Sequence, residues 1–292
     1  MKLSILVCTF NDRIRNVLDL LLPPSEQVEY VVSFQYTDEM FLAMIPTALK
    51  EREDVKLVPH FGSGLSANRN HALRHCTTEY ALLADDDVRY TPESLSKVIA
   101  SFEEHPEVDI LLFQAMLHNG EKLKRYPTHE YDYSQRPRGS YVSSVEIALR
   151  TDAPYPAFDT RFGLGSAYLS CGEEEVWLHQ AWRQGARIRY LPYPLCSIPV
   201  GETTGRRFLS DVRVRRSKGA TLYMMHGMLG SLLRISKAAV LLPSSTPRWQ
   251  CWRDMLDGIL YIYRHPLNEG AAQPIPIDFQ PIEDWKHPLS PS

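Results

Sequence analysis

Short apolar runs alternate with amphipathic segments along the first 115 residues of the chain. The apolar runs have the composition of buried parallel strands, and they span 3–8, 29–34, 55–58, 80–84 and 110–115. The segments between them place apolar side chains at helical spacing, and they span 13–22, 38–50, 65–76 and 92–104. This order predicts a doubly wound α/β sheet, in which a ligand binds outside the carboxyl ends of the strands.

The pattern is less regular between residues 116 and 200. Two extended pieces lie between turn residues in 118–150, and we interpret them as a hairpin beside the sheet. A helix is predicted over 173–184 because Gly185 ends it, and a short strand is predicted over 187–191.

The last third of the chain has a different character. A polar and basic segment, 203–216, precedes a long apolar-rich helical stretch, 220–242. The chain after His265 is rich in proline, which predicts an extended or partly disordered tail. We therefore expect one domain over 1–200, followed over 201–292 by a helical C-terminal extension and the proline-rich tail.

Composition narrows the classes of function. The chain has 292 residues and a formal net charge of -3, so charge gives no case for nucleic-acid binding, which usually needs a basic face. The five cysteines are widely spaced and form no CxxC pair, which is typical of reduced thiols in a cytosolic protein. No apolar run is long enough to predict a membrane-spanning helix.

Three adjacent carboxylates, Asp85, Asp86 and Asp87, directly follow the fourth predicted strand. Because alternate strand residues face the same side, Asp85 and Asp87 are expected to reach one cation, with Asp86 turned toward a nucleotide ribose. Hard oxygen ligands favour Mg²⁺ or Mn²⁺, which would also neutralise a diphosphate. The alternative interpretation is a solvated acidic turn that caps the next helix.

Polar residues also follow the first strand. Thr9, Asn11 and Arg13 are suited to holding a nucleobase or a ribose, although a turn with a helix cap is the better explanation of this segment taken alone.

A glycine-containing turn opens the helix predicted at 65–76. Its free backbone amides, together with the side chains of Asn68, Arg69 and Asn70, offer hydrogen-bond donors to a phosphate. The alternative is an ordinary helix N-terminus capped by Ser66.

Three acids, Glu173, Glu174 and Glu175, open the helix predicted at 173–184. One of them is a candidate general base for an acceptor hydroxyl. The alternative is that these acids have no catalytic role and only stabilise the helix through their interaction with its dipole.

Basic residues stand beside the apolar helical stretch, so 205–242 is a candidate for peripheral contact with anionic lipid headgroups. A packed C-terminal helix with a solvated basic face is the alternative. A third interpretation is that Arg206 or Arg207 contacts a diphosphate when a loop closes.

Taken together, these elements resemble the family-2 glycosyltransferases of the GT-A fold. The family's threonine-aromatic-asparagine turn is similar to Thr9-Phe10-Asn11, and its G-x-S-x-x-R-N helix is similar to Gly64–Asn70. Its D-x-D and G-E-D/E elements are similar to Asp85–Asp87 and Gly172–Glu174. The order and spacing fit over residues 3 to about 195.

The resemblance implies a GT-A type, Rossmann-like sheet that is mixed, mainly parallel and flanked by helices, with donor binding and catalysis in 1–200. It implies inverting transfer of a sugar from a nucleoside-diphosphate sugar, with a uridine diphosphate sugar expected first. The acceptor would be a glycan or a lipid-linked glycan, in the synthesis of surface polysaccharide or other glycans. Such an enzyme is expected in the cytoplasm or peripherally at the inner face of the membrane.

The resemblance also implies residue roles. Asp87, assisted by Asp85, would hold Mn²⁺ or Mg²⁺, and Glu174, with Glu173 next, would be the base. The donor would be bound by residues of all these elements, namely Thr9, Asn11, Arg13, Gln35, Ser66, Arg69, Asn70, Asp85 and Asp86.

Two positions depart from the family pattern. Gln35 or Asp38 must replace an aspartate that usually reads the nucleobase, and Cys196–Pro199 stands where many relatives have a histidine that completes the metal site.

Two other classes of function are weighed against this one. A nucleotidyltransferase also uses paired aspartates but wants a loop with glycine and lysine near the N-terminus, and 9–16 contains neither residue. A non-catalytic sugar-nucleotide-binding module would not need acids at both 85–87 and 173–175.

Overall fold

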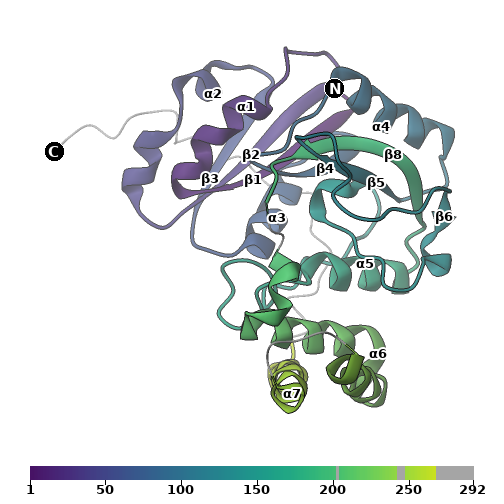
Figure 1. Cartoon of the computed structure of the whole chain (residues 1–292). Coiled ribbons are helices and arrows are strands. Elements are labelled where there is room, and N and C mark those ends of the chain that lie inside the picture. The colour runs from purple at the N-terminus through teal and green to yellow at the C-terminus, as the bar shows by residue number, and fades with distance from the viewer. Residues whose placement is uncertain (202–203, 242–246, 268–292) are drawn as a thin grey trace.

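The computed structural model describes residues 1–201, 204–241 and 247–267, without the side chains of 204–206. Its centre is an eight-stranded sheet with the strand order β3-β2-β1-β4-β7-β5-β8-β6 (Figure 1). The strands are β1 (Leu3–Phe10), β2 (Val28–Tyr36), β3 (Val55–Phe61), β4 (Tyr80–Asp85), β5 (Ile110–Leu117), β6 (Tyr131–Asp132), β7 (Ile147–Arg150) and β8 (Ile188–Ile198). Pairing is parallel except at β6 and β7, so the mixed, mainly parallel sheet expected from the sequence is confirmed.

Helices flank both faces of the sheet. The α-helices are α1 (Val17–Leu20), α2 (Thr47–Glu51), α3 (Leu65–Arg74), α4 (Pro92–Glu104), α5 (Glu173–Arg183), α6 (Val212–Leu241) and α7 (Arg248–Arg264). The 3-10 helices are η1 (Asn11–Asn16), η2 (Glu39–Met44), η3 (Tyr133–Gln135), η4 (Ser144–Glu146) and η5 (Thr204–Leu209). In Figure 1, α3 and α5 lie between the sheet and the pair formed by α6 and α7.

Side chains that point alternately to the two faces of β1 belong to two separate layers of the core. Leu3, Ile5 and Val7 belong to a buried cluster that includes residues of α1 and α4. Leu6 and Cys8 belong to a second cluster that includes residues of α3 and α5. Each strand of this kind is buried on both faces, which is why its sequence is continuously apolar rather than alternating.

Prolines shorten two of the predicted helices. The segment predicted as a helix over 13–22 forms η1 and the four-residue α1, and Pro23 follows shortly afterwards. The segment predicted over 38–50 divides into η2 and α2 on either side of Pro46. Ile45 is extended there, with ψ of 118°, because a residue before proline is driven out of the helical region.

The hairpin predicted within 118–150 is wrong. β6 instead pairs antiparallel with β8 at the sheet edge, and β7 lies inside the sheet, antiparallel to both β4 and β5. Ile147, Ala148 and Leu149 of β7 are almost completely buried, so this short strand joins the two parallel halves of the sheet through its apolar side chains and its backbone hydrogen bonds.

The expected helical extension after residue 200 is present as two helices. α6 begins earlier than predicted, at Val212, and has one non-helical residue, Gly227. The separate helix α7 was not predicted, although Cys251, Met255, Ile259 and Ile262 are buried at helical spacing and could have revealed it. The proline-rich tail lies outside the described residues.

Within the described part of the chain, no helix is both long and apolar enough to cross a membrane. All five cysteines lie in that part, and no disulfide joins any of them.

Two glycines let α6 and α7 touch backbone to backbone. A Cβ atom added to Gly219 would lie 1.8 Å from the carbonyl oxygen of Met255, and one added to Gly258 would lie 1.9 Å from that of Arg216. Both distances are far below van der Waals contact, so any larger residue must push the helices apart.

We therefore expect Gly258→Ala to lower the free energy of unfolding by about 1–3 kcal/mol, the usual cost of forcing atoms into a packed contact. Helix propensity alone would make this substitution stabilising by roughly 1 kcal/mol, so the sign separates the two effects. Urea unfolding measures it. Gly201→Ala is the control, because nothing lies within 4 Å of its added Cβ atom, and equal behaviour of the two variants would contradict the close contact.

Candidate functional site

The three aspartates lie where β4 ends, at the carboxyl edge of the parallel strands. Asp85 is the last residue of β4, and its side chain is 41% exposed. The side chain of Asp87 is 36% exposed, whereas that of Asp86 is 3% exposed. Exposure therefore alternates along the three aspartates, with Asp85 and Asp87 partly open and Asp86 turned inward, although β4 ends at Asp85 and the other two lie in a turn.

Asp86 is held by the turn that follows β1. Its Oδ2 accepts hydrogen bonds from Thr9 Oγ1 at 2.8 Å and Arg13 Nε at 3.0 Å, and Arg13 Nη2 donates to Oδ1. Burial raises the pKa of Asp86 above its ordinary value, and the hydrogen bonds from Arg13 oppose that rise. Asp86, Thr9 and Arg13 thus contact one another in the structure, and the ribose contact expected for Asp86 stays a prediction.

Arg13 also reaches a second acid. Its Nη2 lies 2.9 Å from Asp87 Oδ2, so one guanidinium holds two of the three aspartates. This donor partly offsets the repulsion between adjacent carboxylates that the sequence implies.

Arg69 connects β4 to the start of α5. Its side chain is 3% exposed, and its Nη1 lies 3.0 Å from Glu173 Oε1 and 3.1 Å from Glu174 Oε1. Its Nη2 lies 3.7 Å from Asp85 Oδ1. The guanidinium also lies over the ring of Phe158, 5.6 Å from its centroid. One buried cation is therefore surrounded by carboxylates from two different elements.

The three glutamates of α5 differ in their surroundings. Glu173 is 4% exposed, and its Oε2 has no hydrogen-bond partner among the described residues. Glu175 accepts from Arg136 Nη2 at 2.7 Å and from the amide of Val142 at 3.0 Å, so it anchors the loop over 136–142. Glu174 contacts Arg69 through Oε1 and is 16% exposed, so among the three glutamates it is the one that both belongs to the cluster and is partly open to solvent.

Two carboxyl groups of the cluster, those of Asp85 and Glu173, have raised pKa values. Burial raises the pKa of Asp85 to about 6, against the opposing charge of Arg69. Burial also raises the pKa of Glu173 above its ordinary value of 4.5, and the neighbouring charge of Glu174 adds to the rise. Both groups are therefore poised to exchange charge with a cation or a substrate that enters.

Exposed aromatic rings lie at the ends of β1 and β3. Phe10 is 37% and Phe61 is 70% exposed. Gln35 lies between them in the sheet, since it pairs with Phe10 of β1 and with His60 of β3. Rings of this kind are suited to stacking on a nucleobase. Phe61 was missed because the third strand was expected to end at 58, three residues too early.

Asn11 shapes the same end of the sheet. It has a φ of 50°, a left-handed conformation that asparagine tolerates. Its side-chain Oδ1 accepts from the amide of Thr37 at 3.0 Å, and its Nδ2 donates to Thr37 Oγ1 at 3.1 Å. Asn11 therefore joins the turn after β1 to the end of β2.

The start of α3 is packed against the loop over 158–165. Ser66 Oγ donates to the carbonyl oxygen of Phe162 at 2.8 Å, and the amide of Leu65 donates to that of Leu164 at 2.8 Å. The side chain of Asn70 exchanges hydrogen bonds of 2.9 and 2.7 Å with the main chain of Phe158. Ser66 and Asn70 therefore position this loop, and the donor contacts expected for them from the resemblance stay a prediction.

Asp85 and Asp87 are the described residues best suited to hold a metal ion. No group of three or more His, Cys, Asp or Glu side chains that could hold a metal occurs in the described part of the chain. Mg²⁺ is commonly held by one or two carboxylates, with substrate phosphates and water completing its shell. The donor set of two partly open carboxylates, one with a raised pKa, fits that mode of binding. Cys196 is buried and donates to the carbonyl oxygen of Val145, so it does not replace the histidine found in relatives.

Comparisons with known proteins find one sequence family and one group of similar folds. The sequence model of the family described as Glycosyl transferase family 2 matches residues 4–162, more than half of the chain. No curated protein matches the sequence at a significant level.

Solved structures with a similar fold include residues 1–349 of S. aureus TarS. That structure has a TM-score of 0.55 at 19% identity, covering 89% of this chain and 81% of that one. The same fragment in complex with UDP-GlcNAc has a TM-score of 0.56 at 19% identity, covering 89% and 82% of the two chains. Its complex with UDP has a TM-score of 0.51 at 20% identity, covering 92% and 74%. At these identities the likeness shows a shared fold.

The titration of Glu173 gives a test of the cluster. Because its pKa is raised in the folded state, the folded chain binds its proton more tightly than the unfolded chain does. Its contribution to stability is therefore lost as the pH rises from 4.5 through the raised pKa. We expect Glu173→Gln to become progressively more stable relative to the original chain over this range.

Urea unfolding at a series of pH values measures this difference. Glu130→Gln is the control, because Glu130 is exposed on a loop. A difference between Glu173→Gln and the original chain that is independent of pH would contradict the raised pKa.

Proposed function

Since the chain belongs to glycosyl transferase family 2, we propose that it transfers a sugar from a nucleoside-diphosphate sugar to an acceptor hydroxyl. The family and the GT-A type sheet establish a glycosyltransferase of this fold. The donor class is supported by the complexes of the TarS fragment with UDP-GlcNAc and with UDP. A uridine diphosphate sugar is therefore the first donor to test.

The observation that carries the proposal is the pair of contacts made by Arg69. The same guanidinium lies 3.1 Å from Glu174 and 3.7 Å from Asp85. The candidate base and a candidate metal ligand therefore lie within reach of one side chain, although 89 residues separate them in the sequence. A sugar donor at the end of β4 would have its reacting carbon close to both.

We assign the donor end of the site to Asp85 and Asp87. These two carboxylates would hold Mg²⁺ or Mn²⁺. When bound, the cation would stabilise the negative charge of the leaving diphosphate. Phe10, Phe61 and Gln35, at the ends of β1, β3 and β2, would receive the nucleobase, with Gln35 in place of the aspartate usual in relatives.

We assign the role of general base to Glu174. Its carboxylate takes the proton of the acceptor hydroxyl, whose oxygen then attacks the anomeric carbon as the bond to the diphosphate breaks. Attack from the face opposite the leaving group inverts the configuration at that carbon. Glu173, the second candidate, holds Arg69 through Oε1 and is a positioning residue.

We propose a glycan or lipid-linked glycan as the acceptor, in the synthesis of surface polysaccharide or other glycans on the cytosolic side. A cavity of about 150 Å³ supports the acceptor side of the site. Its lining includes Lys124, Tyr126, Tyr131, Tyr141 and Tyr190. Its wall at Val142 is held by Glu175, the neighbour of Glu174, and tyrosine rings commonly provide flat surfaces for sugars.

These findings bear on the two alternative functions, a nucleotidyltransferase and a non-catalytic binding module. Membership of the family sets the nucleotidyltransferase aside. Only a measurement of turnover can distinguish an active enzyme from a non-catalytic sugar-nucleotide-binding module.

Turnover tests the assigned roles directly. We expect Asp87→Ala and Glu174→Gln each to lower sugar transfer or donor hydrolysis by at least about 100-fold, the usual contribution of a general base or a charge-stabilising group. Glu93→Gln is a matched control, since Glu93 is also an acid in the first turn of a helix but lies on α4. Full activity in both site variants would overturn the assignment.

Donor binding can be tested without turnover. Titrating the chain with UDP-GlcNAc and Mn²⁺ should raise its unfolding temperature, since a ligand at 100 times its Kd stabilises by about 2.7 kcal/mol. The rise should be smaller without Mn²⁺ and in Asp85→Asn/Asp87→Asn. An equal rise with and without Mn²⁺ would exclude a metal-assisted donor site, and no rise with any nucleotide sugar would favour a different ligand.

A further inference from the structure

α6 and α7 pack against each other through one face only. Ile235 and Ala239 of α6 are buried in one cluster with Met255 and Ile259 of α7. In Figure 1 the two helices form a layer of their own on the far side of α5 from the sheet. This packing accounts for their apolar residues on the inner face, and it leaves the outer face to be explained.

The outer face carries large apolar side chains. Leu229, Leu233 and Val240 recur at helical spacing along α6 and are 80%, 74% and 57% exposed. Leu241 and Trp249, where α6 ends and α7 begins, are 65% and 64% exposed. We call these five residues the apolar stripe. Large exposed apolar side chains that recur on one face of a helix mark a contact surface, unlike single exposed apolar residues, which are common.

The charge around the stripe has one sign. α6 contains no Asp or Glu, and residues 212–264 contain nine Lys and Arg against two Asp and Glu, a net charge of +7. The remaining residues contain 23 basic and 33 acidic side chains, a net charge of -10. The chain is acidic overall, so its positive charge is concentrated on this helix pair.

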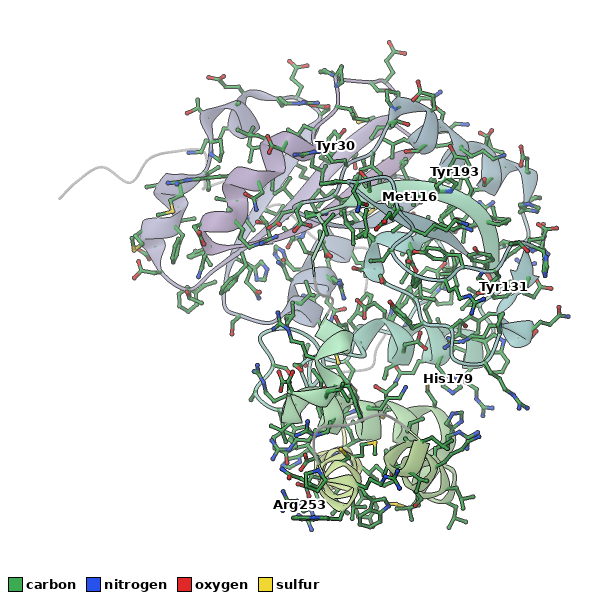
Figure 2. All side chains as sticks on the ribbon, viewed as in Figure 1. Tyr30, Met116, Tyr131, His179, Tyr193 and Arg253 are labelled. Carbon is green, nitrogen blue, oxygen red and sulfur yellow. The ribbon has the colours of Figure 1, made fainter. Side chains whose placement is uncertain are left out.

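Not all of these cations are available to a partner. Arg215 is buried and its Nε lies 2.8 Å from Asp254 Oδ2, while Arg216 lies over the ring of Tyr168. The exposed cations of the helix pair are Arg213, Lys218, Arg234, Lys237, Arg248, Arg253 and Arg264. Figure 2 shows Arg253 at the end of the molecule farthest from the sheet. The sequence made 205–242 the candidate for lipid contact, and in the structure exposed cations also lie beyond that range, at Arg248, Arg253 and Arg264.

The apolar side chains and the positive charge distinguish between the partners that could cover the apolar stripe. A second copy of this chain would bring a helix pair of the same positive charge against the stripe, which is unfavourable. An anionic membrane surface offers both an apolar interior for leucine and tryptophan and negative headgroups for arginine and lysine. No described helix can cross a membrane, so contact would be with its surface.

We propose that the apolar stripe of the α6–α7 pair docks the protein on an anionic lipid surface, with Arg234, Lys237 and Arg253 among the headgroups. Leu229, Leu233 and Trp249 enter the boundary between headgroups and acyl chains. The docking surface is the outer face of the helix pair rather than the basic segment before it.

The helix pair is fixed to the candidate active site. Ala220 of α6 and Ile262 of α7 are buried in one cluster with Val176 of α5 and Phe162. A Cβ atom added to Gly172, the N-cap of α5, would lie 2.4 Å from Thr221 Oγ1. Docking would therefore hold the start of α5, with Glu174, at a set height above the lipid. This last step rests on the proposed function, whereas the docking itself does not.

Sedimentation of the full chain with lipid vesicles tests the docking. The chain should bind vesicles of phosphatidylcholine mixed with phosphatidylglycerol, and bind pure phosphatidylcholine much more weakly. Arg234→Gln/Lys237→Gln should weaken binding about fivefold for each cation removed, and added salt should do the same. Leu229→Gln/Leu233→Gln should abolish most of the remaining binding.

Met40→Gln/Lys50→Gln is the matched control, since it removes one exposed apolar and one exposed basic residue on the sheet side of the molecule. All substituted positions are exposed, so circular dichroism should show folded variants. Equal vesicle binding by the control and the stripe variants, or no binding to the anionic vesicles, would overturn the proposal. A dimer in light scattering that Leu229→Gln/Leu233→Gln dissociates would show that a second copy covers the stripe instead.

Donor hydrolysis in solution separates this proposal from the proposed function. Leu229→Gln/Leu233→Gln should retain it, because the stripe lies outside the site. An original chain that binds anionic vesicles but transfers no sugar would keep the docking and refute the function.

Discussion

The candidate site depends on one buried ion, the guanidinium of Arg69. It is 3% exposed and lies among Glu173, Glu174 and Asp85. A buried charge is tolerated only when it is paired, and removing one partner of such a pair typically costs about 3–5 kcal/mol. The carboxylates hold Arg69 in the interior as much as Arg69 holds them together. This mutual requirement explains how α3 can bury a charged side chain between the end of β4 and the start of α5.

Much of the sheet was predictable because buried parallel strands have continuous apolar runs in their sequence. The runs ending at Cys8, Phe34 and Ala84 place their polar neighbours at one edge, which gave the site its approximate position. β7 was not predictable in this way, since its four residues carry too little periodicity to separate a central strand from a hairpin. The split of the helix over 38–50 followed from Pro46, whose effect on the preceding residue is local.

The different surroundings of the acidic residues could be seen only in the structure. Sequence spacing predicted that Asp85 and Asp87 lie on one side of the strand, and in the structure both side chains are partly exposed, with Asp87 in the turn after β4. It could not show that Arg13, 73 residues away, takes Asp86 out of solvent, or that the loop over 158–165 uses the donors of Ser66 and Asn70. Contacts between distant segments decide which polar groups remain open to a ligand, and a single sequence carries no local signal of them.

The position of β7 has a consequence for how the chain folds. β3, β2, β1 and β4 are built from the first 85 residues, whereas β5 joins them only through a strand that follows it by about 30 residues. Closing that longer loop costs more chain entropy than adding a neighbouring strand does. We therefore expect the half of the sheet up to β4 to assemble first and β7 to join the second half to it late. Pulsed hydrogen exchange would show this as later protection of the amides of Ala148 and Leu149 than of those in β1.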